Sequence, residues 1–126
     1  MQLVELYESY KEESKNYMDW VETLVEKDFE GYGEDVIMAG LEVARDQFNR
    51  LMEESNVLEI SPEEEGNYKD LRYLLMDHLF LASDLAHFYK CKELGRFKMR
   101  VLNNVNKRRR AEMFGSTAGS GSCPIR

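Results

Sequence analysis

Apolar and aromatic residues recur every three or four positions along most of the chain, which is the spacing of one face of an α-helix. The first such segment covers residues 3–29, and charged residues fill its other positions. Gly31 and Gly33 follow it. Because glycine destabilises a helix interior and readily adopts positive φ angles, we expect the first helix to end at these glycines.

Residues 34–54 and residues 94–113 show the same helical spacing. The earlier segment opens with Glu34 and Asp35, whose negative charges stabilise the first turn of a helix. The later segment ends in a run of basic residues, and cations stabilise the last turn. Both segments are therefore predicted to be amphipathic helices with one buried face.

A third helix is predicted for residues 61–91. Its start is marked by Ser61 as the N-cap, Pro62 at the first helical position and Glu64, whose carboxylate can return to the cap amide. Between residues 71 and 89 the segment is apolar on nearly every side, and such a helix is covered on more than one face. We therefore expect it to be either the central helix of a bundle or a subunit interface.

These four segments predict an all-α fold. Short connections between helices favour a single up-and-down antiparallel four-helix bundle over residues 1–114. The chain of 126 residues is long enough for one domain and its core. Residues 115–126 are rich in glycine and serine and carry no helical pattern, so they are predicted to form a flexible tail.

Charge is distributed very unevenly along the chain. Residues 1–89 contain 22 acidic and 7 basic residues, a net charge of −15, whereas residues 90–126 contain 2 acidic and 10 basic residues, a net charge of +8. Such a split indicates that the basic end meets an anionic partner, or that it folds against the acidic part of its own chain or of a second copy.

The leading functional hypothesis is a non-enzymatic module for protein–protein interaction that forms a homo-oligomer. It depends on the apolar residues around the third helix, because large apolar side chains that a bundle cannot cover are typical of an interface. The expected partner is a second copy of the chain or another protein. The residues predicted for this interface are Tyr73, Met76, Phe80, Leu81 and Phe88.

Nucleic-acid binding through the basic fourth helix is the first alternative, since lysine and arginine side chains neutralise phosphates. An acidic body would oppose this binding unless it faced away. No helix-turn-helix, zinc-finger or RNA-stacking motif accompanies the basic run. The candidate residues are Lys98, Arg100, Lys107, Arg108, Arg109 and Arg110.

Metal or small-ligand binding near His87 is the second alternative. Asp84, His87 and Cys91 are spaced i, i+3 and i+7, so they share one helix face and offer oxygen, nitrogen and sulfur donors. The ordinary interpretation is an acid–histidine helix pair beside a thiol. His78 falls on the inward side of the same helix, where we expect a neutral histidine hydrogen-bonded in the core.

Catalytic motifs are missing from the sequence. It contains no glycine-rich phosphate loop and no nucleophile elbow, so we predict no catalytic residue and no cofactor. Two cysteines are too few for a disulfide framework. No run reaches the roughly 18 apolar residues of a membrane helix, and the N-terminus lacks the pattern of a signal peptide. We therefore expect a cytoplasmic protein without a membrane partner.

Overall fold

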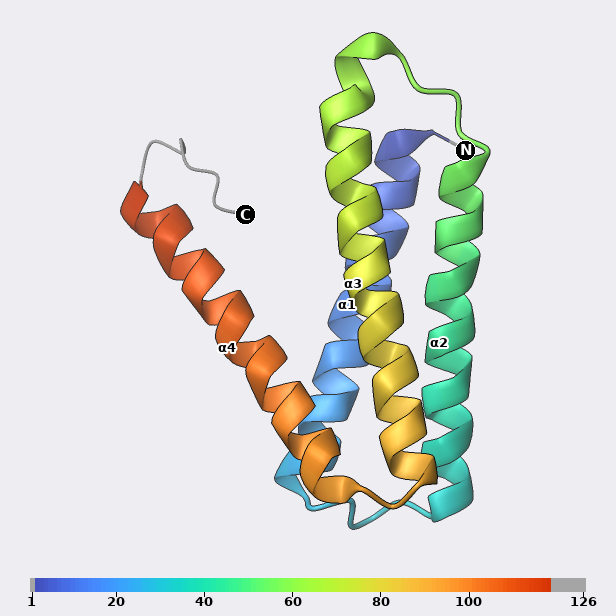
Figure 1. The fold of residues 1–126 in the computed structure, drawn as a ribbon, viewed down its shortest axis with the longest axis vertical. Helices are drawn as coiled ribbons and strands as arrows, with labels where there is room; N and C mark the ends of the chain where they lie inside the picture. The colour runs from blue at the N-terminus through green and yellow to red at the C-terminus, as the bar shows by residue number, and fades with distance from the viewer. Residues whose placement is uncertain (1, 119–126) are drawn as a thin grey trace.

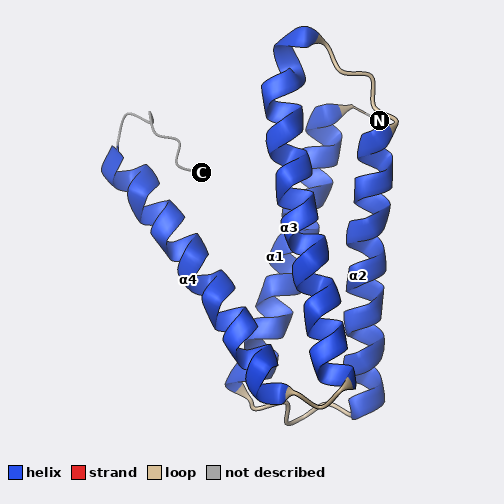
Figure 2. Cartoon of the chain, viewed as in Figure 1, coloured by secondary structure: helices blue, strands red, loops and turns tan. Residues whose placement is uncertain are grey.

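The computed structural model describes the backbone of residues 2–118 and the side chains of residues 2–107. Four α-helices and one short 3-10 turn account for nearly all of this part of the chain, and no strand occurs in it (Figure 2). The all-α prediction is confirmed. The elements are α1 (Leu3–Glu26), α2 (Glu34–Asn56), η1 (Pro62–Glu64), α3 (Glu65–Lys90) and α4 (Leu94–Ala118).

Helix α1 ends at Glu26, earlier than the predicted limit of residue 29. Asp28 and Phe29 both have positive φ angles, 53° and 65°. The amide of Phe29 donates to the carbonyl of Leu24 at 2.7 Å, and that of Asp28 donates to Val25 at 3.1 Å. This hydrogen-bond pattern is a Schellman cap, which turns the chain out of the helix before either glycine is reached.

The start of the third helical segment agrees with the prediction. The amide of Ser61 donates to the carboxylate of Glu64 at 3.3 Å. The first turn after Pro62 is a 3-10 turn, so α3 itself begins at Glu65. The hydroxyl of Tyr68 donates to the carbonyl of Ser55 at 2.8 Å and fixes this turn against the end of α2.

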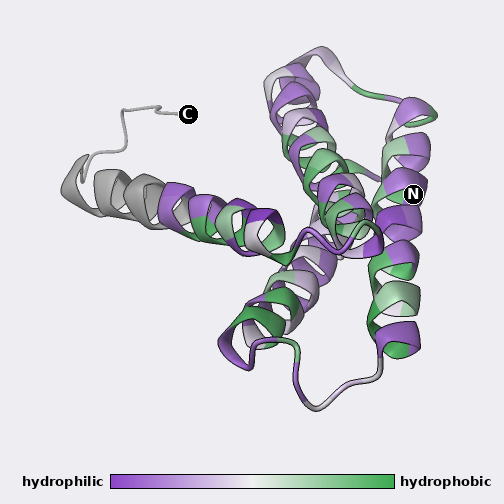
Figure 3. Cartoon of the chain, turned by 60° about the horizontal axis from the view of Figure 1, so that its bottom comes forward, coloured by the Kyte–Doolittle hydropathy of each residue, from purple (hydrophilic) through white to green (hydrophobic). Residues whose placement is uncertain are grey.

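Helices α1, α2 and α3 lie side by side and run in alternating directions (Figure 1). Helix α4 starts at the foot of this three-helix group and leans away from it. Phe97 and Val101 in its first half are buried against α1 and α3. Figure 3 shows α4 leaving the foot of the group in a direction different from the other helices. The up-and-down antiparallel four-helix bundle that we predicted is therefore not confirmed in this detail.

The sequence explains why α4 leans away. Its inward positions are Phe97, Val101 and the half-buried Val105. The next steps of that spacing fall on Arg108 and Glu112, which are charged residues. A helix without an apolar face gains nothing from burial in a bundle, so only the first half of α4 is held.

Helix α4 continues to Ala118, beyond the predicted tail boundary at residue 115. The rest of the predicted tail, residues 119–126, lies outside the described residues. No helix in the described part of the chain is both long enough and apolar enough to cross a membrane.

The core lies between α1, α2 and α3 and is extended at the foot by α4. Gly40 of α2 packs directly against the side chain of Trp20 on α1, because a Cβ atom there would lie 2.5 Å from the indole ring. The largest fully buried side chains are Leu6, Met18, Leu24, Ile37, Leu41, Phe48, Leu75, Leu81, Leu85 and Phe97.

Candidate functional site

His78 forms a polar cluster inside the bundle. Its Nε2 atom lies 2.8 Å from the hydroxyl of Ser14 on α1, and its Nδ1 atom lies 3.1 Å from the carbonyl of Leu74. A carbonyl only accepts, so a neutral ring that donates from Nδ1 and accepts the Ser14 hydroxyl at Nε2 satisfies both contacts. The hydroxyl of Tyr10, 3.3 Å from Nδ1, then accepts a share of the same Nδ1 proton. The rings of Tyr10 and Phe48 lie within 5.3 Å of the imidazole. The arrangement joins α1 to α3 and fits the expected core histidine.

Three large apolar side chains stand on the side of α3 that faces away from the core. Tyr73, Met76 and Phe80 are 75%, 40% and 56% exposed. We call these three residues the outer face of α3. Of the other two residues predicted for an interface, Leu81 is fully buried in the core of the same chain and Phe88 is half-buried.

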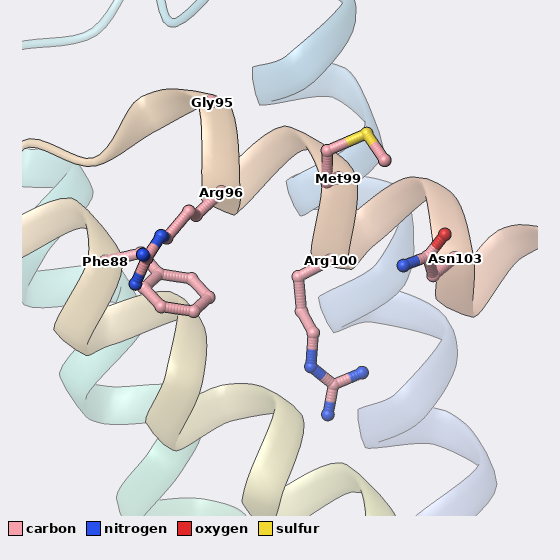
Figure 4. Close-up of a pocket in the computed structure, with 6 residues that line it drawn as sticks. All are labelled: Phe88, Gly95, Arg96, Met99, Arg100 and Asn103. Atoms are coloured by element: carbon pink, nitrogen blue, oxygen red, sulfur yellow. The ribbon is translucent and has the colours of Figure 1, made fainter.

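Phe88 lines a shallow groove between α3 and α4 with a volume of about 310 Å³ (Figure 4). Its ring comes from α3, and every other lining residue comes from the first half of α4. The groove is open and wide at the surface, so it offers a ligand little enclosure. The residues that α4 contributes are Gly95, Arg96, Met99, Arg100 and Asn103.

The basic side chains of α4 that the structure describes pair with carboxylates of the same chain. Lys98 forms an ion pair with Asp28 at the end of α1. Two further pairs reach α3: Arg100 lies 3.1 Å from Asp84, and Lys107 lies 3.2 Å from Asp77. The side chains of Arg108, Arg109 and Arg110 lie outside the described residues.

These pairs bear on both alternatives of the sequence analysis. In the described part of the basic segment, side chains of α4 pair with acidic residues of the same chain, which is one of the two arrangements expected from the charge split. Lys98, Arg100 and Lys107, the candidates for phosphate contacts, already have a carboxylate partner. Asp84, a candidate metal ligand, is the partner of Arg100.

Around His87 the structure brings together a different set of donors. Atoms of His87, Cys91 and Glu93 lie within 4.8 Å of one another. The Nε2 atom of His87 is 3.9 Å from the sulfur of Cys91. Helical spacing did not find Glu93 because this residue follows the end of α3. The available sign was the polar turn at residues 90–93, which brings the chain back toward the helix.

Tyr17 is a further residue that the sequence pattern did not single out for its chemistry. Its hydroxyl is buried and has no hydrogen-bond partner among the described residues. Burial raises the pKa of this phenol above its ordinary value of 10.0, and the charges of Arg100 and Asp84 act on it in opposite directions. The ring itself packs edge-on against Phe48, with ring centres 5.5 Å apart.

No family model, no curated protein and no solved structure matches this chain.

Proposed function

We propose that this protein is a non-enzymatic helical association module and that the outer face of α3 binds a second copy of the chain. The observation that supports this most strongly is the exposure of Tyr73, Met76 and Phe80 on one side of one helix. Leaving three large apolar side chains in water is unfavourable, at roughly 25 cal/mol for each Å² of apolar surface. Covering them with a partner removes that cost.

The spacing of the outer face suits a helix as the partner. Residues 73, 76 and 80 are three and then four positions apart, the interval at which side chains of one helix interlock with those of another. Tyr73 is the most exposed of them, and a tyrosine at the edge of an interface can bury its ring while its hydroxyl stays in water.

The chain's own fourth helix does not cover this face. Helix α4 is attached to α3 through Asp77 and Asp84, which follow Tyr73 and Phe80 by four positions and so lie on nearly the same side of α3. Tyr73 and Phe80 nevertheless remain 75% and 56% exposed. Toward its C-terminal end α4 leans away from the bundle (Figure 1). Among the described residues of a single copy, none covers the outer face of α3 completely.

Charge favours a second copy as the occupant. The acidic body of −15 has far more carboxylates than the three that pair with α4, so the basic segment of +8 of a second copy can approach those that remain. A symmetric pair places the same patch of both subunits at its interface, so one apolar face is sufficient.

Native mass spectrometry and sedimentation velocity of the full chain at moderate ionic strength test this proposal. We expect a dimer for the wild type and a monomer for Phe80→Asp, because a carboxylate in the apolar interface would be buried without a partner. Val43 is a matched control, since it is 54% exposed on α2, so Val43→Asp should remain dimeric. A monomeric wild type, or equal effects of the two variants, would contradict the proposal.

The proposal treats the protein as cytoplasmic, as the sequence analysis predicts. Nucleic-acid binding is supported by no contact of the described residues, because the basic side chains among them that were predicted to contact phosphates are paired with carboxylates. It stays a prediction from the basic run.

A further inference from the structure

The end of α3 folds back on itself and gathers three side chains with metal-binding atoms. Lys92 has a φ angle of 60°, in the left-handed region. The amide of Glu93 then donates to the carbonyl of Phe88 at 2.8 Å, and that of Lys92 donates to Tyr89 at 3.0 Å. This is a Schellman cap. It reverses the chain so that Glu93 returns beside His87 and Cys91 in the last turn.

The three donors have the chemistry of a zinc site, and the nitrogen and sulfur atoms lie close to the spacing that zinc requires. Imidazole nitrogen, thiolate sulfur and carboxylate oxygen are the three protein donors that zinc uses. With a tetrahedral ion, the nitrogen and sulfur ligands would stand about 3.6 Å apart. Nε2 of His87 and the sulfur of Cys91 are 3.9 Å apart, and all three donor atoms lie within 4.8 Å of one another.

We propose that His87, Cys91 and Glu93 bind one zinc ion, with a water molecule as its fourth ligand. The site differs from the set predicted by helical spacing, because Asp84 is engaged by Arg100 and Glu93 supplies the oxygen donor. His87 and Cys91 are exposed, so an ion reaches them from solvent without any rearrangement of the core. The proposal does not depend on the association of two copies.

Nearby charges both favour and oppose the binding of a zinc ion. The negative end of the helix dipole of α3 favours a cation at this position. Arg96 opposes the ion, since its guanidinium lies 3.5 Å from the carboxylate of Glu93 and must give up that contact. Lys90 and Lys92 are exposed neighbours of the same turn and add positive charge. The thiolate and the carboxylate must therefore supply most of the attraction.

Zinc titration of the full chain under reducing conditions, in a Cys123→Ser background, tests the site because Cys91 is then the one thiol present. We expect a stoichiometry of one zinc per chain. Cobalt(II) in place of zinc should produce a thiolate-to-metal charge-transfer absorption.

Variants identify the ligands. Cys91→Ser and His87→Gln should each weaken zinc binding by about 10-fold or more, and Cys91→Ser should abolish the cobalt charge-transfer band. Glu93→Gln should weaken binding, whereas Asp84→Asn should leave it unchanged. The proposal is overturned by a cobalt complex without the thiolate band, by unchanged affinity in Cys91→Ser, or by an Asp84→Asn effect as large as that of Glu93→Gln. Circular dichroism checks that each variant is folded.

Discussion

The Nε atom of Arg100 lies 3.1 Å from the Oδ2 atom of Asp84, joining α4 to α3 across sixteen residues of chain. Each residue had a different expected role, Arg100 as a phosphate contact and Asp84 as a metal ligand. Their mutual contact gives both side chains a structural role at the place where α4 is attached. Because Asp84 is paired with Arg100, Glu93 and not Asp84 is the candidate oxygen donor near His87.

The Arg100–Asp84 pair should contribute measurably to stability. Both side chains are half-exposed, at 33% and 49%, so solvent screens the interaction. In a double-mutant cycle with Arg100→Gln and Asp84→Asn, we expect a coupling free energy of about 0.5 to 1 kcal/mol, measured by urea denaturation at low salt. The coupling should decrease at 1 M salt.

Lys15 and Asp19 form the matched control for this cycle. They are a pair four residues apart on α1, with side chains that are 77% and 67% exposed. Their coupling should be about 0.3 kcal/mol. If the two cycles gave the same value, the Arg100–Asp84 contact would have no special part in holding α4.

Gly40→Ala should destabilise the protein, although alanine is the better helix former. The new methyl group would lie 2.5 Å from the indole of Trp20, so the ring or one helix must move. We expect a net loss of about 1 to 2 kcal/mol in the free energy of unfolding. Trp20 is the only tryptophan, so its fluorescence should also change as the ring is displaced.

Gly66→Ala is the control for that substitution. Gly66 lies in α3, and nothing stands within 4 Å of its would-be Cβ atom. The variant should gain about 0.5 kcal/mol of stability from the reduced flexibility of its unfolded chain. If Gly40→Ala were as stable as Gly66→Ala and its fluorescence were unchanged, the space beside Trp20 would be large enough for a methyl group.

Tyr17→Phe should stabilise the protein by about 1 kcal/mol, because it removes a buried hydroxyl that lacks a hydrogen-bond partner among the described residues. The edge-on packing against Phe48 would be retained. Tyr10→Phe makes the same chemical change where the hydroxyl lies 3.3 Å from Nδ1 of His78. The free energy of unfolding of Tyr10→Phe should be about 1 kcal/mol lower than that of the wild type. Equal shifts in the urea midpoints of the two variants would show that the two hydroxyls do not differ in hydrogen bonding.

Stability above pH 10 should depend on the same phenol. Burial raises the pKa of Tyr17 in the folded protein, while the unfolded chain releases the proton near its ordinary pKa of 10.0. Above pH 10 the folded state therefore holds more protons than the unfolded state, and the free energy of unfolding falls as pH rises. This group contributes a slope of at most about 1.4 kcal/mol per pH unit.

Urea denaturation at pH 9, 10 and 11 tests the effect. The lysines and the other tyrosines titrate in both proteins, so the difference between wild type and Tyr17→Phe isolates this residue. Tyr17→Phe should lose stability less steeply above pH 10. Parallel curves for the two proteins would mean that the phenol ionises in the folded state as readily as in the unfolded chain.

Local pattern was sufficient to predict the helices. The amide of Ser61 and the carboxylate of Glu64 meet as expected, because a capping contact involves residues only three positions apart. Local sequence pattern is less reliable for predicting where a helix ends. Asp28 and Phe29 take positive φ angles without being glycines, so α1 ends before the residues that marked its expected end.

Contacts between distant residues could not be predicted in this way. The sequence does contain a sign that α4 leaves the bundle. Its apolar inward positions end at Val105, and the next inward position is Arg108. By contrast, the ion pair between Arg100 and Asp84 depends on the angle at which α4 crosses α3. The spacing of residues within one helix does not predict that angle. Glu93 was missed for a third reason, because a turn and not a helix brings it to His87.

Lys92→Gly should stabilise the end of α3. A residue with a side chain costs roughly 1 kcal/mol at a φ angle of 60°, whereas glycine adopts it freely. The greater entropy of glycine in the unfolded chain offsets part of this gain, so we expect a net increase of about 0.5 kcal/mol in the free energy of unfolding. Lys92→Ala removes the same charge but keeps the Cβ atom, and it should show no increase. If both variants behaved alike in urea denaturation, the lysine charge and not the backbone conformation would control this turn.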